Sequence, residues 1–294
     1  MQPSVLVCQC EHAVRIDPAK LRAVFSGLST AGIAYAAVPD LCGLAATRDP
    51  RLKTLAEDRL TRIVACHRRA VQALFRFAGA PLADVKTQVI DLRAGSAADA
   101  LCAMGLALTP ACETDHPPIV EPARTASPNA GQWIPWFPVI DSERCTNCQQ
   151  CLGFCLFGVY GRAADGKVAV HNPQGCKTNC PACARICPEV AIIFPKYESG
   201  SIAGAEITDE SREKSRIQAD RQSILGSDIY GALAQRRQKV QRRQLLRSEV
   251  GLASLERQQQ LQPSSEDRLP SGSGTAFPGV TRVGGEPADN PSAP

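Results

Sequence analysis

The sequence has few aromatic residues and no long hydrophobic run. Aromatic residues make up only 5% of the 294 residues, although hydrophobic residues reach 44%, which is enough for a buried core. No apolar run approaches the roughly 20 residues that a membrane-spanning helix needs. The opening stretch M-Q-P-S-V-L-V-C lacks the basic start and the long apolar segment of an export signal. We therefore expect a cytoplasmic protein without a membrane span.

Two further features are missing. G-x-G-x-x-G follows none of the expected strands, so no dinucleotide-binding fold of that type is predicted. The net charge of +4 is too small, averaged over the chain, to favour nucleic acid as a partner.

Cysteine, in contrast, is abundant, with 14 residues. In a secreted protein this number would indicate disulfides, but the grouped spacings favour metal ligands in a reducing compartment. Eight cysteines fall between positions 145 and 188 in two related groups. The first group is Cys145, Cys148, Cys151 and Cys155, and the second is Cys176, Cys180, Cys183 and Cys187.

The spacing within these groups predicts iron–sulfur clusters. A C-x-x-C-x-x-C loop places three thiolates around one face of a cube, and the fourth thiolate leads away to the other cube. Zinc is the competing interpretation, but zinc sites usually close with two C-x-x-C pairs. A thiol-redox enzyme is disfavoured because C-P-A-C at position 180 belongs to the larger ligand set.

Residues 139–195 resemble bacterial-type two-cluster ferredoxins, because both halves repeat a cysteine loop, a short helical turn and an apolar strand. This resemblance implies a ferredoxin-like α+β module with two [4Fe-4S] clusters and crossed ligation. Two departures are Leu156, where proline is usual, and the three residues 177–179, where two are usual. Neither removes a ligand. The implied sets are Cys145, Cys148, Cys151 and Cys187 for one cluster, and Cys176, Cys180, Cys183 and Cys155 for the other.

Residues 1–110 are predicted to form a small α/β domain with a parallel sheet. Short apolar strands are expected at 4–8, 33–38, 62–66 and 85–91. Helices alternate with them at short spacing and begin near Pro18, Pro50, Arg68 and Ser96, the last running to about position 108.

Four more cysteines fall at the expected carboxyl edge of that sheet, where open α/β folds bind ligands. They predict a third metal site, although free cysteines are often simply buried. The adjacent His12 and His67 are interpreted as rim residues, and Cys102, on the face of an apparent core helix, and Cys112, in a linker, as unligated thiols. The candidate ligands are Cys8, Cys10, Cys42 and Cys66.

This first third of the chain resembles the N-terminal domain of the A subunit of heterodisulfide reductase. The resemblance rests on V-L-V-C-Q-C-E-H, the lone Cys42 and I-V-A-C-H-R-R-A-V-Q-A-L-F-R. In that family the domain is thought to hold an unconventional [4Fe-4S] cluster, so the resemblance implies one here. The flavin domain of that protein has no counterpart, and a flavin-bifurcating role does not carry over.

The other segments are predicted from composition. Residues 111–138 form a proline-rich linker whose Trp133 and Trp136 pack as a lid on the next domain or else dock a partner. Residues 198–262 are charged and partly helical, with an apolar stripe from Ile224 to Val250 that indicates an amphipathic helix. Six basic residues between 236 and 247 form either a docking stripe or a solvated face. Residues 263–294 have a disordered composition.

We expect an iron–sulfur electron-transfer protein with two [4Fe-4S] clusters and a third in the N-terminal domain. The cysteine-rich module has no acid–base pair or nucleophile placed for substrate chemistry, so an electron carrier or oxidoreductase subunit is favoured over a stand-alone enzyme. The expected partner is a redox protein. One alternative is an electron-input subunit of a larger flavin-containing oxidoreductase complex, with a flavoprotein as partner. The other is a redox-sensing regulator whose basic helix binds nucleic acid.

Overall fold

The computed structural model describes residues 4–13, 15–57, 61–82, 87–106 and 133–226, with positions 228, 231–232, 234–236, 238–242 and 245–246. They belong to one compact unit, Met1–Leu246. Cys112 and the tail 263–294 lie outside the described residues. No helix in the described ranges is long and apolar enough to cross a membrane.

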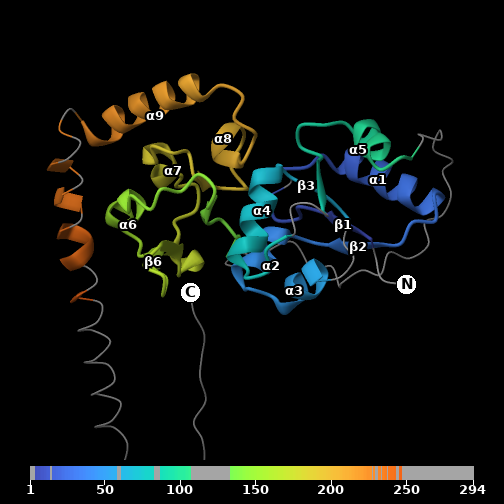
Figure 1. Ribbon diagram of the computed structural model, residues 1–294, viewed down its shortest axis with the longest axis horizontal. Coiled ribbons are helices and arrows are strands. Elements are labelled where there is room, and N and C mark those ends of the chain that lie inside the picture. The colour runs from blue at the N-terminus through green and yellow to red at the C-terminus, as the bar shows by residue number, and fades with distance from the viewer. Residues whose placement is uncertain are drawn as a thin grey trace, which may run out of the picture. The chain divides into compact units, whose positions relative to one another are not determined.

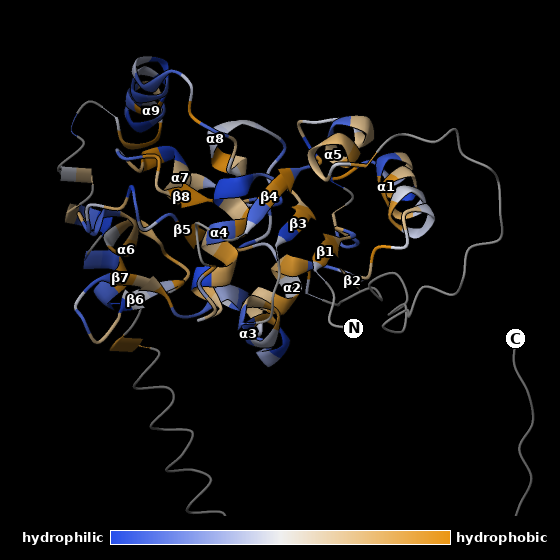
Figure 2. Cartoon of the chain, turned by 45° about the vertical axis from the view of Figure 1, so that its right-hand side comes forward, coloured by the Kyte–Doolittle hydropathy of each residue, from blue (hydrophilic) through white to orange (hydrophobic). Residues whose placement is uncertain are grey.

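A four-stranded parallel sheet forms the N-terminal part, as the sequence predicts (Figure 1). Its strand order is β2-β1-β3-β4, and each neighbouring pair runs parallel. Strands β1 and β3 are largely hydrophobic (Figure 2), which is typical of strands buried on both faces. The strands are β1 (Val5–Cys8), β2 (Tyr35–Val38), β3 (Arg62–Ala65) and β4 (Gln88–Asp91).

Helices cover both faces of this sheet. One face packs its Val5 and Val7 against α1 (Pro18–Thr30) and α5 (Ala97–Ala103). A Cβ atom added at Gly27 of α1 would lie 2.5 Å from Leu101, so glycine permits the close approach of these two helices. The opposite face packs against the buried residues of three other helices. These are α2 (Leu41–Ala46), α3 (Pro50–Glu57) and α4 (Arg68–Phe77).

Two helices of this domain begin at N-cap residues that can be recognised in the sequence. Asp17 accepts a hydrogen bond from the backbone of Ala19 at 2.8 Å, with Pro18 as the first helical residue of α1. Ser96 and Asp99 form a reciprocal capping box at the start of α5. Each cap satisfies amide groups that a helix end would otherwise leave unpaired, which fixes the helix starts.

The cysteine-rich part has the expected internal repeat. Each half has a cysteine loop, a helix of five residues and a strand, and a hairpin with Gly166 in its turn (φ 78°) joins the halves. Strand β5 (Val139–Ile140) pairs antiparallel with β8 (Ile192–Ile193). The other elements are α6 (Gln150–Phe154), α7 (Ala182–Ile186), the short 3-10 turn Pro173–Gly175, and the antiparallel pair β6 (Tyr160–Arg162) and β7 (Val168–Val170).

The core of one sheet face continues into the cysteine-rich part. The ring of Phe137 lies 5.3 Å from that of Phe77 on α4, and the ring of Trp136 lies 5.4 Å from that of Phe194. Trp136 is only 5% exposed. This burial supports the packing interpretation of the tryptophan segment over the docking interpretation.

Two helices follow β8, inside the segment 198–262 that is predicted to be partly helical, although the sequence does not locate either helix individually. They are α8 (Gly200–Ala203) and α9 (Glu210–Leu225), and α9 is mostly hydrophilic (Figure 2). Ion pairs hold α9 in place: Arg144 reaches Glu210 through two nitrogens at 2.7 and 2.9 Å, and Arg185 reaches Asp220. Because charge pairing replaces an apolar stripe here, hydrophobic periodicity cannot locate this helix.

Other predictions of local structure are wrong or incomplete. Cys42 lies shortly after the second strand, as expected, but the helix that carries it, α2, is not predicted because it is too short for periodicity to reveal. Helix α5 ends at Ala103 instead of near position 108, and Cys102 is exposed. Within the described part of the predicted C-terminal stripe, Val240 is buried but Leu245 and Leu246 are 63% and 51% exposed. These three apolar residues therefore do not share a buried face.

A buried ion pair ties α4 to the cysteine-rich part. The Arg69 guanidinium donates to Asp141 at 3.0 Å and to the carbonyl oxygens of Ala205 and Val190 at 3.1 and 2.9 Å. Both charged side chains are about nine-tenths buried. The hydrogen bonds compensate the cost of removing these charges from water, so losing one partner would leave the other uncompensated.

We expect Arg69→Met to lower the free energy of unfolding by about 3–5 kcal/mol, because it leaves the Asp141 charge buried without its partner. Anaerobic urea denaturation followed by circular dichroism measures this change. The matched control is Arg51→Met, whose ion pair with Asp49 is on the surface and whose loss should cost at most about 1 kcal/mol. Equal effects of the two substitutions would contradict the expectation.

Candidate metal centres

The first cysteine loop is shaped by residues in the left-handed conformation. Asn147 has a φ of 57° and Gln149 a φ of 60°, and asparagine is among the residues that adopt this region most readily. The Asn147 side-chain oxygen accepts a hydrogen bond from the backbone of Val168 at 2.9 Å, which ties the loop to β7. The loop then enters α6, which carries Cys151.

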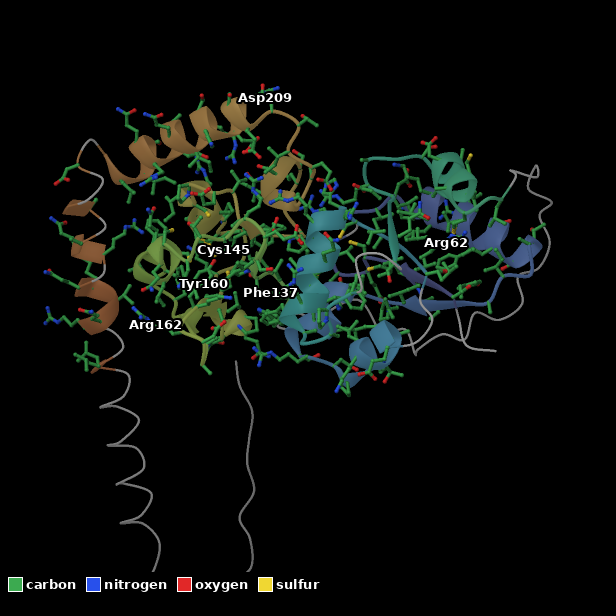
Figure 3. All side chains as sticks on the ribbon, viewed as in Figure 1. Arg62, Phe137, Cys145, Tyr160, Arg162 and Asp209 are labelled. Carbon is green, nitrogen blue, oxygen red and sulfur yellow. The ribbon has the colours of Figure 1, made fainter. Side chains whose placement is uncertain are left out.

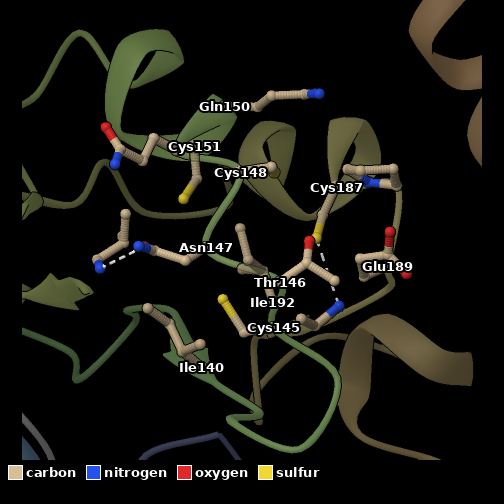
Figure 4. Close-up of a pocket in the computed structure, with 14 residues that line it drawn as sticks. Ile140, Cys145, Thr146, Asn147, Cys148, Gln150, Cys151, Cys187, Glu189 and Ile192 are labelled. Atoms are coloured by element: carbon tan, nitrogen blue, oxygen red, sulfur yellow. Dashed lines mark hydrogen bonds between the residues drawn. The ribbon is translucent and has the colours of Figure 1, made fainter. Parts of the chain in front are cut away.

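Four cysteines line a hollow of about 380 Å³ at this loop (Figure 4). Three belong to the first group, and the fourth, Cys187, comes from the end of the second group. The Cys187 sulfur accepts a hydrogen bond from the backbone of Ala191 at 3.4 Å. Apolar side chains such as Ile140 and Ile192 complete the wall. The cysteines are Cys145, Cys148, Cys151 and Cys187.

A second hollow, of about 410 Å³, is also lined by four cysteines, with the roles of the two cysteine groups exchanged. Three cysteines come from the second group, and the fourth, Cys155, comes from the end of the first. Phe154, Phe157 and Val159 add apolar walls. The cysteines are Cys176, Cys180, Cys183 and Cys155.

Tyr160 is part of the wall of the second hollow, and Figure 3 shows it in the same part of the structure as Cys145, which lines the first. Its buried hydroxyl donates to the sulfur of Cys183 at 3.1 Å. Burial raises the pKa of Tyr160 well above its ordinary value, and negative charge on Cys183 and on Cys151 raises it further. Since these cysteines line different hollows, the two candidate centres are neighbours.

Neither departure from the ferredoxin pattern removes a cysteine from a hollow. Asn179, at the end of the longer second loop, has a φ of 59° and repeats the left-handed turn of Asn147. Cys155, which precedes Leu156, has nearly the same backbone angles as Cys187, which precedes the usual proline. The longer loop and the leucine therefore change the surroundings of the thiols and keep their placement.

Four of these eight thiols are poorly suited to ionise without a metal. Burial, assisted by neighbouring thiolates, raises the pKa of Cys151 and of Cys176 to about 12. The same causes raise the pKa of Cys183 and Cys187. A cysteine must be a thiolate to bind a metal. Burial in the apolar walls disfavours that thiolate, so iron has to supply the positive charge that stabilises it.

The four N-terminal cysteines lie at or shortly after the carboxyl ends of β1, β2 and β3. Cys8, Cys42 and Cys66 belong to one core cluster, and Cys10 belongs to the cluster on the other face of the sheet. Each is between 5% and 8% exposed. The Cys8 sulfur accepts a hydrogen bond from the backbone of Leu41 at 3.4 Å. Cys10 has a φ of 52°, an unfavourable conformation for a residue with a Cβ atom and one that clusters at functional sites. The cysteines are Cys8, Cys10, Cys42 and Cys66.

Charge on neighbouring thiols of this set contributes to the pKa of three of its members. Burial raises the pKa of Cys66 to about 12, with Cys10 the largest contributor among its charged neighbours. Burial also raises the pKa of Cys8 and of Cys42, and thiolates of the same set add to both shifts. A cluster with thiolate ligands fits this set, because four buried thiols converge.

Sequence reasoning named His12 and His67 beside the thiols but missed Asp40, Asp91 and the hydrogen bonds that connect these groups. Asp40 caps α2 through the backbone of Gly43 at 3.0 Å, and His67 Nδ1 lies 2.6 Å from Asp91. His12 donates its backbone N–H to Asp40 at 3.3 Å. Asp40 could have been recognised in the sequence as a helix N-cap. The contacts of His12 with Asp40 and of His67 with Asp91 join residues far apart in the sequence, so no local pattern predicts them. In the described ranges, no three Cys, His, Asp or Glu side chains are placed to hold a single metal ion.

The two reciprocal hollows and the internal repeat define an iron–sulfur protein of the ferredoxin class. A family described as a 4Fe-4S dicluster domain matches residues 137–217. No solved structure matches the chain significantly.

Curated relatives agree with that class. An uncharacterised ferredoxin of Methanocaldococcus jannaschii is 52% identical over 63 residues, which cover 21% of this chain and 42% of the relative. The pyruvate synthase subunit PorD of the same organism is 31% identical over 80 residues, 27% of this chain and 91% of PorD. PorD of Methanothermobacter marburgensis is 30% identical over 74 residues, 25% of this chain and 84% of that PorD.

This chain belongs to the 4Fe-4S dicluster ferredoxin family. It is an iron–sulfur, metal-binding protein of electron transport. The family match begins at residue 137, so the resemblance of the N-terminal domain to heterodisulfide reductase stays a prediction.

We expect Tyr160→Phe to make the potential of the second-hollow cluster more negative, because a hydrogen bond to sulfur stabilises the more negative, reduced state. The shift should be on the order of tens of millivolts, where 59 mV corresponds to a tenfold change for a one-electron couple. Anaerobic redox titration followed by electron paramagnetic resonance measures it. Tyr35→Phe, on β2, is the control, and a shift of the same size there would count against the assignment.

Proposed function

We propose that this protein relays electrons through two crosswise-ligated [4Fe-4S] clusters and a third cluster in its α/β domain. One observation carries the first part: each hollow draws three cysteines from one loop and the fourth from the other half. When bound, each cluster supplies a reversible one-electron site. We assign Cys145, Cys148, Cys151 and Cys187 to one cluster, and Cys155, Cys176, Cys180 and Cys183 to the other.

The residues around the clusters keep water out and hold the sulfurs in place. Phe154, Phe157 and Ile192 provide apolar walls. The Tyr160 hydroxyl and the backbone of Ala191 donate to sulfur, which favours the reduced state. Because Tyr160 is close to cysteines of both hollows, an electron needs only a short step between the two clusters.

The third cluster rests on the four buried thiols of the α/β domain. They come from three different segments of the chain, so their convergence is a property of the fold and not of one local motif. Burial raises the pKa of Cys8, Cys42 and Cys66, so iron has to favour their ionisation. We propose Cys8, Cys10, Cys42 and Cys66 as its ligands.

The chain covers only 42% of the uncharacterised ferredoxin, so that relative informs the cysteine-rich part and not the whole protein. The PorD relatives favour a second candidate function, a subunit that passes electrons into a larger oxidoreductase complex. The dicluster family matches residues 137–217 and does not include the α/β domain. This domain is therefore the candidate docking site for a flavoprotein partner. Co-purification of a flavin-containing protein with the chain from its native cells would support this function.

The basic stretch supports contact with a redox protein more than a nucleic-acid-binding regulator. The Arg236 guanidinium lies 4.1 Å from the centre of the Phe154 ring, in the wall of the second hollow. A cation at that position lies beside a cluster, where an electron-transfer partner has to approach. Salt-sensitive retention on DNA that depends on cluster state would instead favour the regulator. We place the protein in the cytoplasm because its ligands require reduced thiols.

Iron and sulfide counting after anaerobic reconstitution tests the number of clusters. We expect about twelve irons per chain, and Cys42→Ala should retain about eight because it removes one ligand of the third cluster. Cys102→Ala is the control, since this thiol is exposed and unassigned. About eight irons in the unaltered protein would refute the third cluster and leave the other two standing.

A further inference from the structure

The α/β domain and the cysteine-rich part share a second buried ion pair, and this one lies beside the N-terminal cysteines. Lys196, which follows β8, donates its ammonium group to Asp40, which precedes α2. Both side chains are only 3% exposed. A lysine is almost never buried to this extent unless its surroundings supply negative charge.

Asp40 supplies one such charge, and its carboxylate also accepts hydrogen bonds from the backbone of Gly43 and of His12. Burial by itself lowers the pKa of Lys196. Negative charge on Cys42, Asp40 and Cys10 outweighs burial and raises the pKa above its ordinary value. Geometry also places this ammonium group beside the thiols. Its partner Asp40 lies two residues before Cys42, and Leu41, between them, donates its backbone N–H to the Cys8 sulfur at 3.4 Å.

Two arginines fix the position of the chain around Lys196. Arg15 donates to the backbone oxygen of Lys196 itself at 2.9 Å. Arg93, which follows β4, donates to the backbone oxygens of Pro195 and Tyr197 at 3.0 and 2.9 Å. Both arginines belong to the α/β domain, so that domain holds a segment of the cysteine-rich part against its own ligand-binding edge.

We propose that Lys196 completes the N-terminal iron–sulfur site from the other module, as the cation that balances the charge of its four cysteine ligands. This inference rests on the proposed third cluster. Lys196 is a positioning residue and not a ligand. A cluster held by four thiolates is negatively charged, and each reduction adds one more negative charge. A buried cation therefore favours retention of the cluster and stabilises its reduced form relative to its oxidised form.

The test uses the full chain, reconstituted anaerobically, with Lys196→Met and Lys196→Arg. Lys196→Met keeps the length of the side chain and removes its charge. We expect it either to shift the potential of the N-terminal cluster to more negative values or to lower the iron content from about twelve to about eight. Lys196→Arg should keep both the iron content and the potential near those of the unaltered protein. The signal that is missing in Cys42→Ala identifies the N-terminal cluster in the redox titration.

Two control variants separate the charge from simple loosening of the structure. Arg76→Met removes contacts of α4 with Ser142 and Glu143 in the cysteine-rich part, away from the four thiols. Lys53→Met removes a lysine charge from an exposed pair. We expect neither to change the N-terminal cluster.

Three results would overturn the inference. An unchanged iron content and potential in Lys196→Met would refute the role of Lys196 while leaving the third cluster intact. If Arg76→Met lowered the iron content or shifted the potential as much as Lys196→Met, the effect would come from weaker contact between the α/β domain and the cysteine-rich part and not from the lysine charge. About eight irons in the unaltered protein would refute the third cluster and, with it, the role of Lys196, while the two-cluster relay would stand.

Discussion

Negative charge on buried sulfur has to be compensated in both parts of this protein. Thiolates that ligate iron have to lie in apolar walls, where burial opposes their ionisation and raises the pKa of thiols such as Cys151 and Cys66. Iron supplies most of the compensating charge, and donors such as Tyr160 supply more. The N-terminal site differs because its surroundings include a whole buried cation, Lys196.

The interface between the two parts follows the same logic. Besides the aromatic packing of Phe77 and Phe137, it contains two buried charged pairs, Arg69 with Asp141 and Lys196 with Asp40. Such pairs add little net stability, but each tolerates only one arrangement of its partners. The interface therefore fixes the distance between the sheet edge and the cysteine-rich part, which an electron relay requires.

Much of this arrangement could be predicted from the sequence because it is local. The spacing of the eight clustered cysteines predicts two groups of three with an exchanged fourth, and that pattern recurs in the two hollows. The alternation of strands and helices predicts the parallel sheet, and Asp17 and Ser96 mark helix starts. In a parallel sheet, cysteines at strand ends meet at one edge, so the expected strands alone suffice to bring Cys8 and Cys66 together.

What could not be predicted depends on distant segments or on charge. Asp40 and Lys196 are 156 residues apart, and no periodicity connects them. Helix α9 has no apolar stripe and is held by pairs such as Arg185 with Asp220, which only the fold reveals. Cys42 lies in a six-residue helix, shorter than the window in which a helical period can be recognised.

The separation of Asp40 and Lys196 along the chain also has a consequence for biosynthesis. The four N-terminal cysteines leave the ribosome first, and domains generally fold in that order during synthesis. Lys196 is translated 156 residues after Asp40, once both cysteine loops of the ferredoxin-like part have been made. The full set of charges around the proposed third site therefore forms only after Lys196 has left the ribosome.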